Sequence, residues 1–331
     1  MIIQLHPDIP QSEAERLARS VAAFYVHDGE KQLLVTSSSE KSLHPTLERF
    51  AKSHWVADSD IQLSSRSYRA ENRITRMGDM ELGNGLNTVV IGGPCSVENE
   101  SQIRSAAQLV KDNGLHIFRA GAFKPRTSPY TFQGLGMEGL ELLEMVRAEY
   151  GLRIITEVKD SSHVEAVIET ADIIQIGAKA MYDHSILHAC GESRKPVLIK
   201  RGFGTTLQEL AQAAEFILSK GNMQVMLCER GIRSFETKTR FTLDLCGAAW
   251  LKYACNLPII LDPSHAMGYA YGVPDLARAC MAMGVDGLLI ETHPEPAKAL
   301  SDASQQLNPS EFTALVASLH PIAKAIDRKL I

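Results

Sequence analysis

The sequence predicts an α/β protein: a (β/α)8 TIM barrel preceded by a small ferredoxin-like α+β domain. Eight short apolar runs recur after residue 86, amphipathic helical patterns separate them, and polar or charged side chains follow almost every run. Eight parallel strands that alternate with helices close into a barrel of roughly 250 residues, and barrel enzymes carry their chemistry at the C-terminal ends of the strands. The chain of 331 residues therefore suits one barrel and one appended unit.

The eight predicted strands are continuous apolar runs, which is typical of parallel strands that are covered on both faces. They comprise residues 88–92, 116–120, 153–158, 173–177, 196–200, 224–228, 258–261 and 287–290. A doubly wound open sheet would show the same alternation with helices, so it stays open as an alternative. The polar residues at the ends of the runs favour the barrel.

The segments between the runs carry a 3.6-residue apolar stripe, which predicts helices that pack against the strands. The helix expected over residues 207–217 has two possible capping boxes at its start. Either Thr205 pairs with Gln208, or Thr206 pairs with Glu209.

The first 70 residues predict a separate small domain that contains no catalytic constellation. Their element order is β-α-β-β-α-β, as in a ferredoxin-like sandwich, over residues 2–5, 13–23, 24–27, 32–36, 46–53 and 55–63. A polar stretch that begins at Ser64 has no helix or strand period and predicts a linker. We place the boundary near Glu71, with a regulatory domain over 1–70 and the catalytic barrel over 71–331.

The bulk composition excludes several protein classes. Hydrophobic residues at 45% and charged residues at 22% are ordinary for a globular protein, and the net charge of −5 argues against a nucleic-acid partner. No apolar run is long enough for a membrane helix, the N-terminus lacks the features of a signal peptide, and the six cysteines form no CxxC pair. We therefore expect a cytoplasmic protein that acts on small molecules and binds neither nucleic acid nor membrane.

Four potential metal ligands follow well-separated strands: Cys95, His265, Glu291 and Asp302. One thiolate, one imidazole and two carboxylates suit a divalent transition metal such as Mn²⁺, Fe²⁺, Co²⁺ or Zn²⁺. Taken singly, each would more often be a core cysteine, a capping histidine or a solvated acid. Their shared position at the rim of the barrel favours a metal site.

Cationic side chains gather at the same rim: Arg119, Lys124, Arg126, Lys200 and Arg230. Cations at this density are costly to bury unless an anion neutralises them. Arginine holds phosphate bidentately and lysine acts as a point charge, so the set suits two phosphorylated substrates. Thr127 and Ser128 add hydroxyl donors in a loop that a proline stiffens. A solvated basic rim is the alternative.

Six motifs carry a resemblance to a known family. They are Gly93-Pro-Cys-Ser-Val-Glu98, Arg119-Ala-Gly-Ala-Phe-Lys-Pro-Arg-Thr-Ser128, Leu198-Ile-Lys-Arg-Gly202, Cys228-Glu-Arg-Gly-Ile-Arg-Ser-Phe-Glu236, Leu261-Asp-Pro-Ser-His265 and Glu291-Thr-His-Pro-Glu-Pro-Ala-Lys-Ala-Leu-Ser-Asp302. In order and spacing they resemble the type I 3-deoxy-7-phosphoheptulonate (DAHP) synthases, in the branch close to the 3-deoxy-manno-octulosonate 8-phosphate (KDO8P) synthases. The match runs from about Arg76 to Leu307, and the N-terminal segment more loosely resembles the ferredoxin-like regulatory extension of some members.

The resemblance implies an aldol-type condensation of phosphoenolpyruvate with erythrose 4-phosphate, the first step of the shikimate pathway of aromatic amino acid biosynthesis. It also implies that Cys95, His265, Glu291 and Asp302 ligate the metal. Residues implied to hold phosphoenolpyruvate are Arg119, Lys124, Lys200 and Arg230. Residues implied to hold the aldose phosphate are Arg126, Thr127 and Ser128, and we add Asp262 to the substrate-binding set.

Lys124 is the expected proton donor to the developing alkoxide, provided that burial among cations lowers its pKa toward neutrality. His265 and Asp302 are the alternative catalytic groups, and the sequence does not choose between them.

Two positions depart from the family pattern. Lys179 stands where the family has an arginine that contacts the phosphate of phosphoenolpyruvate, and lysine is not bidentate. Residues 266–272 replace a loop that is rich in arginine in close relatives. Both changes leave the reaction class intact and bear on affinity and on the choice of aldose.

Two other functions remain as alternatives. KDO8P synthase uses arabinose 5-phosphate and has an asparagine-containing loop, whereas the loop here, residues 126–128, favours erythrose phosphate. A non-catalytic, metabolite-binding paralogue is the remote alternative, because a fold does not guarantee activity. We also expect a homo-oligomer, a dimer or a tetramer, and feedback inhibition by tyrosine or phenylalanine through residues 1–70.

Overall fold

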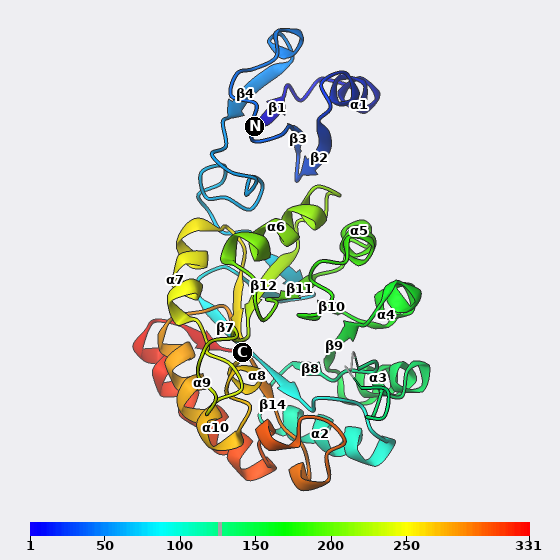
Figure 1. Cartoon of the computed structure of the whole chain (residues 1–331), viewed down its shortest axis with the longest axis vertical. Helices are drawn as coiled ribbons and strands as arrows, with labels where there is room; N and C mark the ends of the chain where they lie inside the picture. The colour runs from blue at the N-terminus through cyan, green and yellow to red at the C-terminus, as the bar shows by residue number, and fades with distance from the viewer. Residues whose placement is uncertain (125–127) are drawn as a thin grey trace.

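The structure is a computed structural model that describes residues 1–124 and 128–331. A closed parallel barrel forms the larger part, and a small antiparallel domain stands to one side of it (Figure 1). Among the described residues, no helix combines the length and the apolar character that crossing a membrane requires.

The barrel strands follow one another around the sheet in chain order. They are β7 (Asn87–Gly93), β8 (Ile117–Arg119), β9 (Arg153–Val158), β10 (Ile173–Ile176), β11 (Val197–Lys200), β12 (Val225–Glu229), β13 (Ile259–Leu261) and β14 (Gly287–Glu291). Parallel pairing of β14 with β7, from Gly287 opposite Val89 to Glu291 opposite Gly93, closes the barrel. The predicted barrel is confirmed, and the open sheet is excluded.

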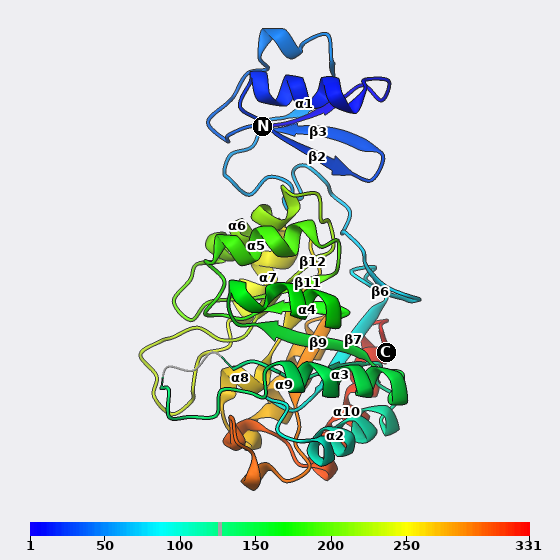
Figure 2. The ribbon, with the colours of Figure 1, turned by 90° about the vertical axis from the view of Figure 1, so that its right-hand side faces the viewer.

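Helices cover the outside of the barrel. They are α2 (Glu100–Asp112), α3 (Met137–Tyr150), α4 (Val164–Thr170), α5 (His184–Glu192), α6 (Leu207–Leu218), α7 (Leu245–Ala254), α8 (Pro263–Met267), α9 (Val273–Ala282) and α10 (Pro309–Ala325). Figure 2 shows α3, α4, α5 and α6 stacked along one side. Of the two possible capping boxes, α6 uses the pair Thr206 and Glu209. The Thr206 hydroxyl accepts a hydrogen bond from the backbone N–H of Glu209, and the Glu209 carboxylate accepts one from the backbone N–H of Thr206.

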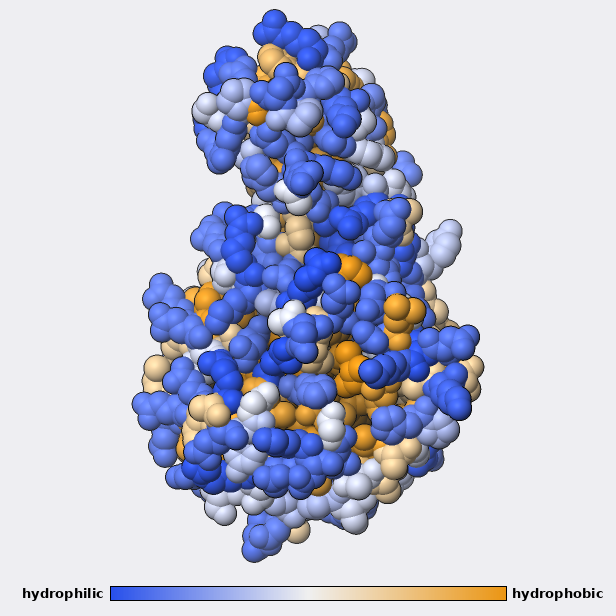
Figure 3. Space-filling view, turned by 180° about the vertical axis from the view of Figure 1, so that it is seen from behind, coloured by the Kyte–Doolittle hydropathy of each residue, from blue (hydrophilic) through white to orange (hydrophobic). Residues whose placement is uncertain are grey.

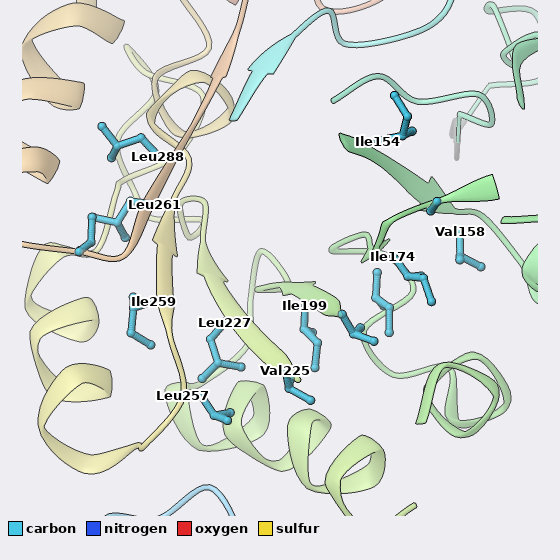
Figure 4. Close-up of a cluster of buried hydrophobic side chains, with 14 of the residues drawn as sticks. Ile154, Val158, Ile174, Ile199, Val225, Leu227, Leu257, Ile259, Leu261 and Leu288 are labelled. Atoms are coloured by element: carbon cyan, nitrogen blue, oxygen red, sulfur yellow. The ribbon is translucent and has the colours of Figure 1, made fainter. Parts of the chain in front are cut away.

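The core has two layers because successive strand residues point to opposite faces of the sheet. Inside the barrel, Ile117, Ile155 and Leu198 belong to one buried cluster. The residues adjacent to them in these strands, such as Phe118, Ile154 and Ile199, point outward and belong to the cluster beneath the helices. Figure 4 shows part of this outer layer.

The N-terminal domain is confirmed as a small antiparallel α+β unit. It consists of β1 (Ile2–Leu5), α1 (Gln11–Ser20), β2 (Phe24–Asp28), β3 (Lys31–Val35) and β4 (Ala51–Trp55), with strand order β2-β3-β1-β4. Figure 3 shows this domain from behind, with a mainly hydrophilic surface, and apolar residues gathered over the barrel below it.

The helix predicted over residues 46–53 is wrong, as is the strand predicted over 55–63. A single 3-10 turn, Pro45–Leu47, precedes β4, and β4 ends at Trp55. The spacing of Leu47, Phe50 and Ala51 imitates a helix face. Residues 51–55 form a strand because β4 pairs with β1 and so satisfies the backbone hydrogen-bonding groups on the second edge of β1.

The segment after β4 is fastened to the barrel. Glu215 of α6 accepts hydrogen bonds from the backbone N–H groups of Gln62, Leu63 and Ser64 at 2.8–3.0 Å, and from the Ser64 hydroxyl at 2.5 Å. Burial raises the pKa of the Glu215 carboxyl, and these hydrogen bonds act against that rise. Residues that precede the predicted boundary near Glu71 are therefore bound to the barrel, and the boundary itself stays a prediction.

A hairpin that was not predicted from the sequence packs at the N-terminal end of the barrel. It consists of β5 (Thr75–Met77) and β6 (Met80–Leu82), whose Met77, Met80 and Leu82 pack on the inner apolar cluster. The Gly78-Asp79 turn between two short strands was the available signal.

Candidate active site

Four side chains from the ends of three strands, β7, β13 and β14, meet at the C-terminal end of the barrel: Cys95, His265, Glu291 and Asp302. Each offers one ligand atom, and these atoms all lie within 4.8 Å of one another. Among residues 1–124 and 128–331, no other group of three or more such side chains has this geometry. The predicted ligand set is brought together, and its mixture of sulfur, nitrogen and oxygen donors fits a divalent transition metal.

His265 is held in one orientation by the residue that caps its helix. Its Nδ1 lies 2.7 Å from Oδ2 of Asp262, while its Nε2 lies 3.3 Å from Oε1 of Glu291. A carboxylate on one ring nitrogen is the usual support of a histidine that binds metal through the other nitrogen. Asp262 is fully buried, and it also receives the ammonium of Lys200 at 2.5 Å.

The electrostatics of the cluster favour a bound cation. Burial, together with the Glu291 carboxylate, raises the pKa of the Cys95 thiol to about 12. Burial also lowers the pKa of His265, so the imidazole is neutral and able to donate a lone pair. For Glu291 burial acts to raise the pKa, but its positively charged neighbours, which include Arg119 and Lys124, act in the opposite direction and the pKa is lowered. A cation would stabilise the thiolate that burial disfavours.

Three of the predicted cations already have partners in the protein. Arg119 is 1% exposed and its Nη1 lies 2.5 Å from Oε1 of Glu291. The ammonium of Lys124 donates to both the sulfur and the carbonyl oxygen of Cys95 at 3.0 Å. Lys200 pairs with Asp262 as described above. These contacts offset part of the cost of burying the cations.

The expectation that burial lowers the pKa of Lys124 is wrong. Burial and Arg119 do act in that direction, but Cys95, Glu157 and Glu291 outweigh them and raise the pKa. The Lys124 ammonium therefore keeps its proton near neutral pH beside the metal-ligand cluster.

A cavity of about 200 Å³ opens beside the cluster. Its lining consists of Lys124, Glu157, Gly177, Ala178, Lys179, Lys200, Phe203, Arg230, Arg240, His265 and Asp302. The combination of several cations with two metal ligands suits an anionic substrate that also reaches the metal.

Arg230 is the lining cation whose surroundings most clearly require an anion. Its guanidinium lies 5.0 Å from the ring centroid of Phe203 and 4.3 Å from that of Phe241. Within the described part of the chain, it pairs with no carboxylate, and its two hydrogen bonds reach backbone carbonyls at 3.5 Å. Burial lowers its pKa. An anion in the cavity would supply the missing countercharge.

The other predicted residues lie at different distances from this cavity. Ser128 is half-buried and its carbonyl accepts from the hydroxyl of Thr131, and it does not line the cavity. Asp262 stands behind the lining, where it supports Lys200 and His265. Arg126 and Thr127 lie outside the described residues.

The sequence analysis gave no role to several residues that the structure places at the site: Glu157, Gln175, Phe203, Arg240 and Gln305. Glu157 ends a predicted strand at the rim, so its position was a usable signal. Gln175 accepts from Nε of Arg119 and donates to Glu157, contacts that no sequence spacing reveals.

Comparisons with known proteins agree with this geometry. Residues 60–327 match the model of the DAHP synthetase I family. The chain is 43% identical over 269 residues to a phospho-2-dehydro-3-deoxyheptonate aldolase of Thermotoga maritima, which covers 81% of this chain and 79% of that protein. A 2-dehydro-3-deoxyphosphooctonate aldolase of Magnetococcus marinus is 34% identical over 274 residues, and the match covers 77% of this chain and 93% of that protein.

Solved structures extend the likeness to the whole fold. The crystal structure of the Thermotoga maritima phospho-2-dehydro-3-deoxyheptonate aldolase (DAHP synthase) matches with a TM-score of 0.81 and 37% identity over 100% of this chain and 99% of that one. A truncated form of the Thermotoga maritima 3-deoxy-D-arabino-heptulosonate 7-phosphate synthase matches with a TM-score of 0.77 and 39% identity over 82% of this chain and 100% of that one. The matched region contains all four clustered ligands and every residue that lines the cavity, and the chain therefore belongs to the DAHP synthetase I family.

Proposed function

We propose that this protein is a DAHP synthase, which condenses phosphoenolpyruvate with erythrose 4-phosphate to give 3-deoxy-D-arabino-heptulosonate 7-phosphate and phosphate. The observation that carries this proposal is the cationic cavity that opens onto the cluster of four metal ligands. The higher identity to a DAHP synthase, 43%, than to a phosphooctonate aldolase, 34%, supports erythrose 4-phosphate as the aldose.

The cavity offers separate groups to the two ends of phosphoenolpyruvate, which bears a phosphate and a carboxylate. Arg230 and Lys179 line the cavity and are the candidates for the phosphate. Lys200 also lines the cavity and pairs with Asp262, whereas Arg119 lies behind the lining and pairs with Glu291. Arg126, Thr127 and Ser128 remain the candidates for the phosphate of the aldose. Binding both substrates in one cavity replaces a bimolecular encounter by a positioned one.

The chemistry requires a polarised aldehyde and a proton. A divalent metal such as Mn²⁺, Fe²⁺, Co²⁺ or Zn²⁺, held by the cluster, would act as the Lewis acid on the aldehyde carbonyl. The enol carbon of phosphoenolpyruvate then bonds to the aldehyde carbon, water adds to C2, and phosphate leaves. Lys124, whose Nζ lies 3.0 Å from the Cys95 sulfur, holds a proton beside the oxygen that becomes a hydroxyl.

The decisive assay is phosphate release from phosphoenolpyruvate with erythrose 4-phosphate or with arabinose 5-phosphate, each with and without a chelator. We expect rapid release with erythrose 4-phosphate, slow release with arabinose 5-phosphate, and loss of activity with the chelator. A preference for arabinose 5-phosphate would identify a KDO8P synthase instead. No release with either aldose, at any of the four metals, would favour a non-catalytic paralogue.

Lys179→Arg is expected to lower the KM for phosphoenolpyruvate or to leave it unchanged. Lys179 and Arg230 both line the cavity, and a guanidinium can hold a phosphate with two parallel hydrogen bonds where an ammonium acts as a point charge. Steady-state kinetics with each substrate varied in turn measure the effect. A KM that rises clearly would show that the cavity needs the smaller ammonium at this position.

We also propose that the N-terminal domain regulates the barrel and that tyrosine or phenylalanine is the inhibitor. In support, no residue of this domain lines the cavity, and its linker is bonded to α6 through Glu215. An inhibitor that acts through this domain must bind one arrangement of the two units better than the other.

Deleting residues 1–60 is expected to leave an active barrel that tyrosine and phenylalanine no longer inhibit. The cut retains Gln62, Leu63 and Ser64, so Glu215 keeps its four hydrogen bonds. Initial rates of the full chain and of the truncated chain are compared over millimolar concentrations of each amino acid. If the full chain ignores tyrosine, phenylalanine and tryptophan, the domain has a structural role instead.

A further inference from the structure

Two residues outside the metal-ligand cluster connect its two carboxylates: Arg240 and Gln305. Nη1 of Arg240 lies 3.4 Å from Oδ2 of Asp302 and donates to Oε1 of Gln305 at 2.8 Å. Nε2 of Gln305 in turn donates to Oε2 of Glu291 at 2.6 Å. We propose that Gln305 and Arg240 are positioning residues that hold Glu291 and Asp302 in the orientation that binds metal. The inference rests on the proposed metal site.

Gln305 suits this place because of its hydrogen-bonding chemistry. Its side chain is 1% exposed, so each polar atom needs a partner within the protein. On one side lies a carboxylate, which only accepts, and on the other a guanidinium, which only donates. The uncharged amide of Gln305 has one acceptor group and one donor group, and these two neighbours fix the orientation of the amide.

The hydrogen bond from Gln305 restricts the orientation of the Glu291 carboxylate. The second carboxylate oxygen, Oε1, faces Nη1 of Arg119 at 2.5 Å and Nε2 of His265 at 3.3 Å. Both oxygens are therefore engaged from different directions, and the plane of the carboxylate is fixed. Without Gln305, Oε2 would lose its described hydrogen bond inside a buried site, and the carboxylate could rotate away from His265.

Asp302 has a left-handed backbone conformation, with a φ of 45°, which aspartate adopts more readily than most residues other than glycine. The same atom of Arg240, Nη1, contacts both the Asp302 carboxylate and the Gln305 amide. One guanidinium therefore supports one ligand directly and a second ligand through an amide.

Arg240 is itself held against the helix that carries His265. Its backbone N–H donates to the carbonyl of Met267, and the next residue, Phe241, donates to that of Ala266. Gly268 leaves room for this contact, since a Cβ there would lie 2.4 Å from the Cβ of Arg240. The segment that carries Arg240 is therefore hydrogen-bonded directly to the segment that carries the ligand His265.

The test is the metal affinity of Gln305→Met, a change that keeps the approximate volume and removes both hydrogen bonds. Co²⁺ is titrated into the metal-free full chain in competition with a chromophoric chelator. We expect the dissociation constant to rise about 10- to 100-fold, the usual effect of losing a group that orients a metal ligand. Gln62→Met is the matched control, because it removes a buried glutamine amide from the linker region and should leave the metal affinity unchanged.

Arg240→Met provides a second variant, since its side chain is 40% exposed and tolerates replacement more readily. It should weaken Co²⁺ binding as well, and combining it with Gln305→Met should weaken binding by less than the product of the two single effects, because both act on one chain of contacts. A folded Gln305→Met or Arg240→Met protein that binds Co²⁺ within twofold of the wild type overturns the inference. Since no substrate is present, a failure of the proposed DAHP synthase activity is detected separately, in the phosphate-release assay.

Discussion

Cys95→Ala is expected to reduce kcat about 1,000-fold or more and to weaken metal binding by at least about 100-fold. The thiol is fully buried and its sulfur lies 3.3 Å from Oδ2 of Asp302, so it is positioned as one of the four ligands. Losing a metal that stabilises developing charge by several kcal/mol costs a factor of ten for each 1.36 kcal/mol. About 4 kcal/mol would account for the expected loss.

The same thiol gives metal binding a pH dependence that distinguishes ligation from packing. Burial raises the pKa of Cys95 to about 12, so at neutral pH the thiol must release a proton when it binds a cation. The pKa values of His265, Glu291 and Asp302 are all lowered, and these groups need no further deprotonation near pH 7. Metal affinity of the wild type should therefore rise with pH by up to about tenfold per unit.

Cys95→Ala should lose this pH dependence together with the affinity. Competition titrations with Zn²⁺ or Co²⁺ measure both the affinity and its pH dependence. They cover roughly pH 6.5 to 8.5, the range in which the other ligands stay deprotonated. Cys246→Ala is the matched control, because Cys246 is an exposed cysteine in α7. Full metal content and a full rate in Cys95→Ala would exclude Cys95 as a ligand.

The barrel was predictable because its strands are covered on both faces and so appear as continuous apolar runs. The metal ligands were predictable for a related reason. In a parallel barrel every strand ends at the same rim, so a ligand-type residue after a strand, such as Cys95 or Glu291, has its approximate place fixed by the fold.

The parts that escaped prediction depend on tertiary contacts. Residues 51–53 were predicted as the end of a helix from their local spacing, but they form part of β4 because β1 offers them an open edge. Gln305 ends a single 3-10 turn, Ala303–Gln305, and only the contacts with Glu291 and Arg240 give its amide a role. The pKa of Lys124 rises because Cys95 and Glu157 lie near it in the fold, whereas the charged residues near it in the sequence, Arg119 and Arg126, are cations.

A second buried network supports the loop that supplies two cavity cations, Arg230 and Arg240. Nη1 of Arg201 lies 2.8 Å from Oε2 of Glu229 and 2.9 Å from Oδ2 of Asp244, and Arg201 is 4% exposed. The other oxygen of Glu229 accepts from the backbone N–H groups of Gly231 and Asp244, near the two ends of this loop. Arg201 therefore neutralises the carboxylates that fix the loop.

Arg201→Met is expected to lower the free energy of unfolding by about 3–5 kcal/mol, because it leaves the fully buried Glu229 without its cation. Urea unfolding at pH 7 measures the loss, and Arg104→Met is the control. Arg104 pairs with Glu100 and Glu149 on the surface, where an ion pair contributes at most about 1 kcal/mol.

Lowering the pH should reduce the deficit of Arg201→Met relative to the wild type. Burial already raises the pKa of Glu229 in the native protein, and removing Arg201 removes the main group that opposes this rise. A carboxyl whose pKa is higher in the folded than in the unfolded state destabilises the fold at high pH, and this destabilisation fades as pH falls through the folded pKa and then the unfolded pKa. Adding Glu229→Gln to Arg201→Met should restore part of the stability at pH 7, since a neutral amide replaces the unpaired charge. If Arg201→Met is no less stable than Arg104→Met, or if its deficit grows at low pH, then Arg201 does not neutralise Glu229 in the folded protein and the loop is held by its backbone hydrogen bonds alone.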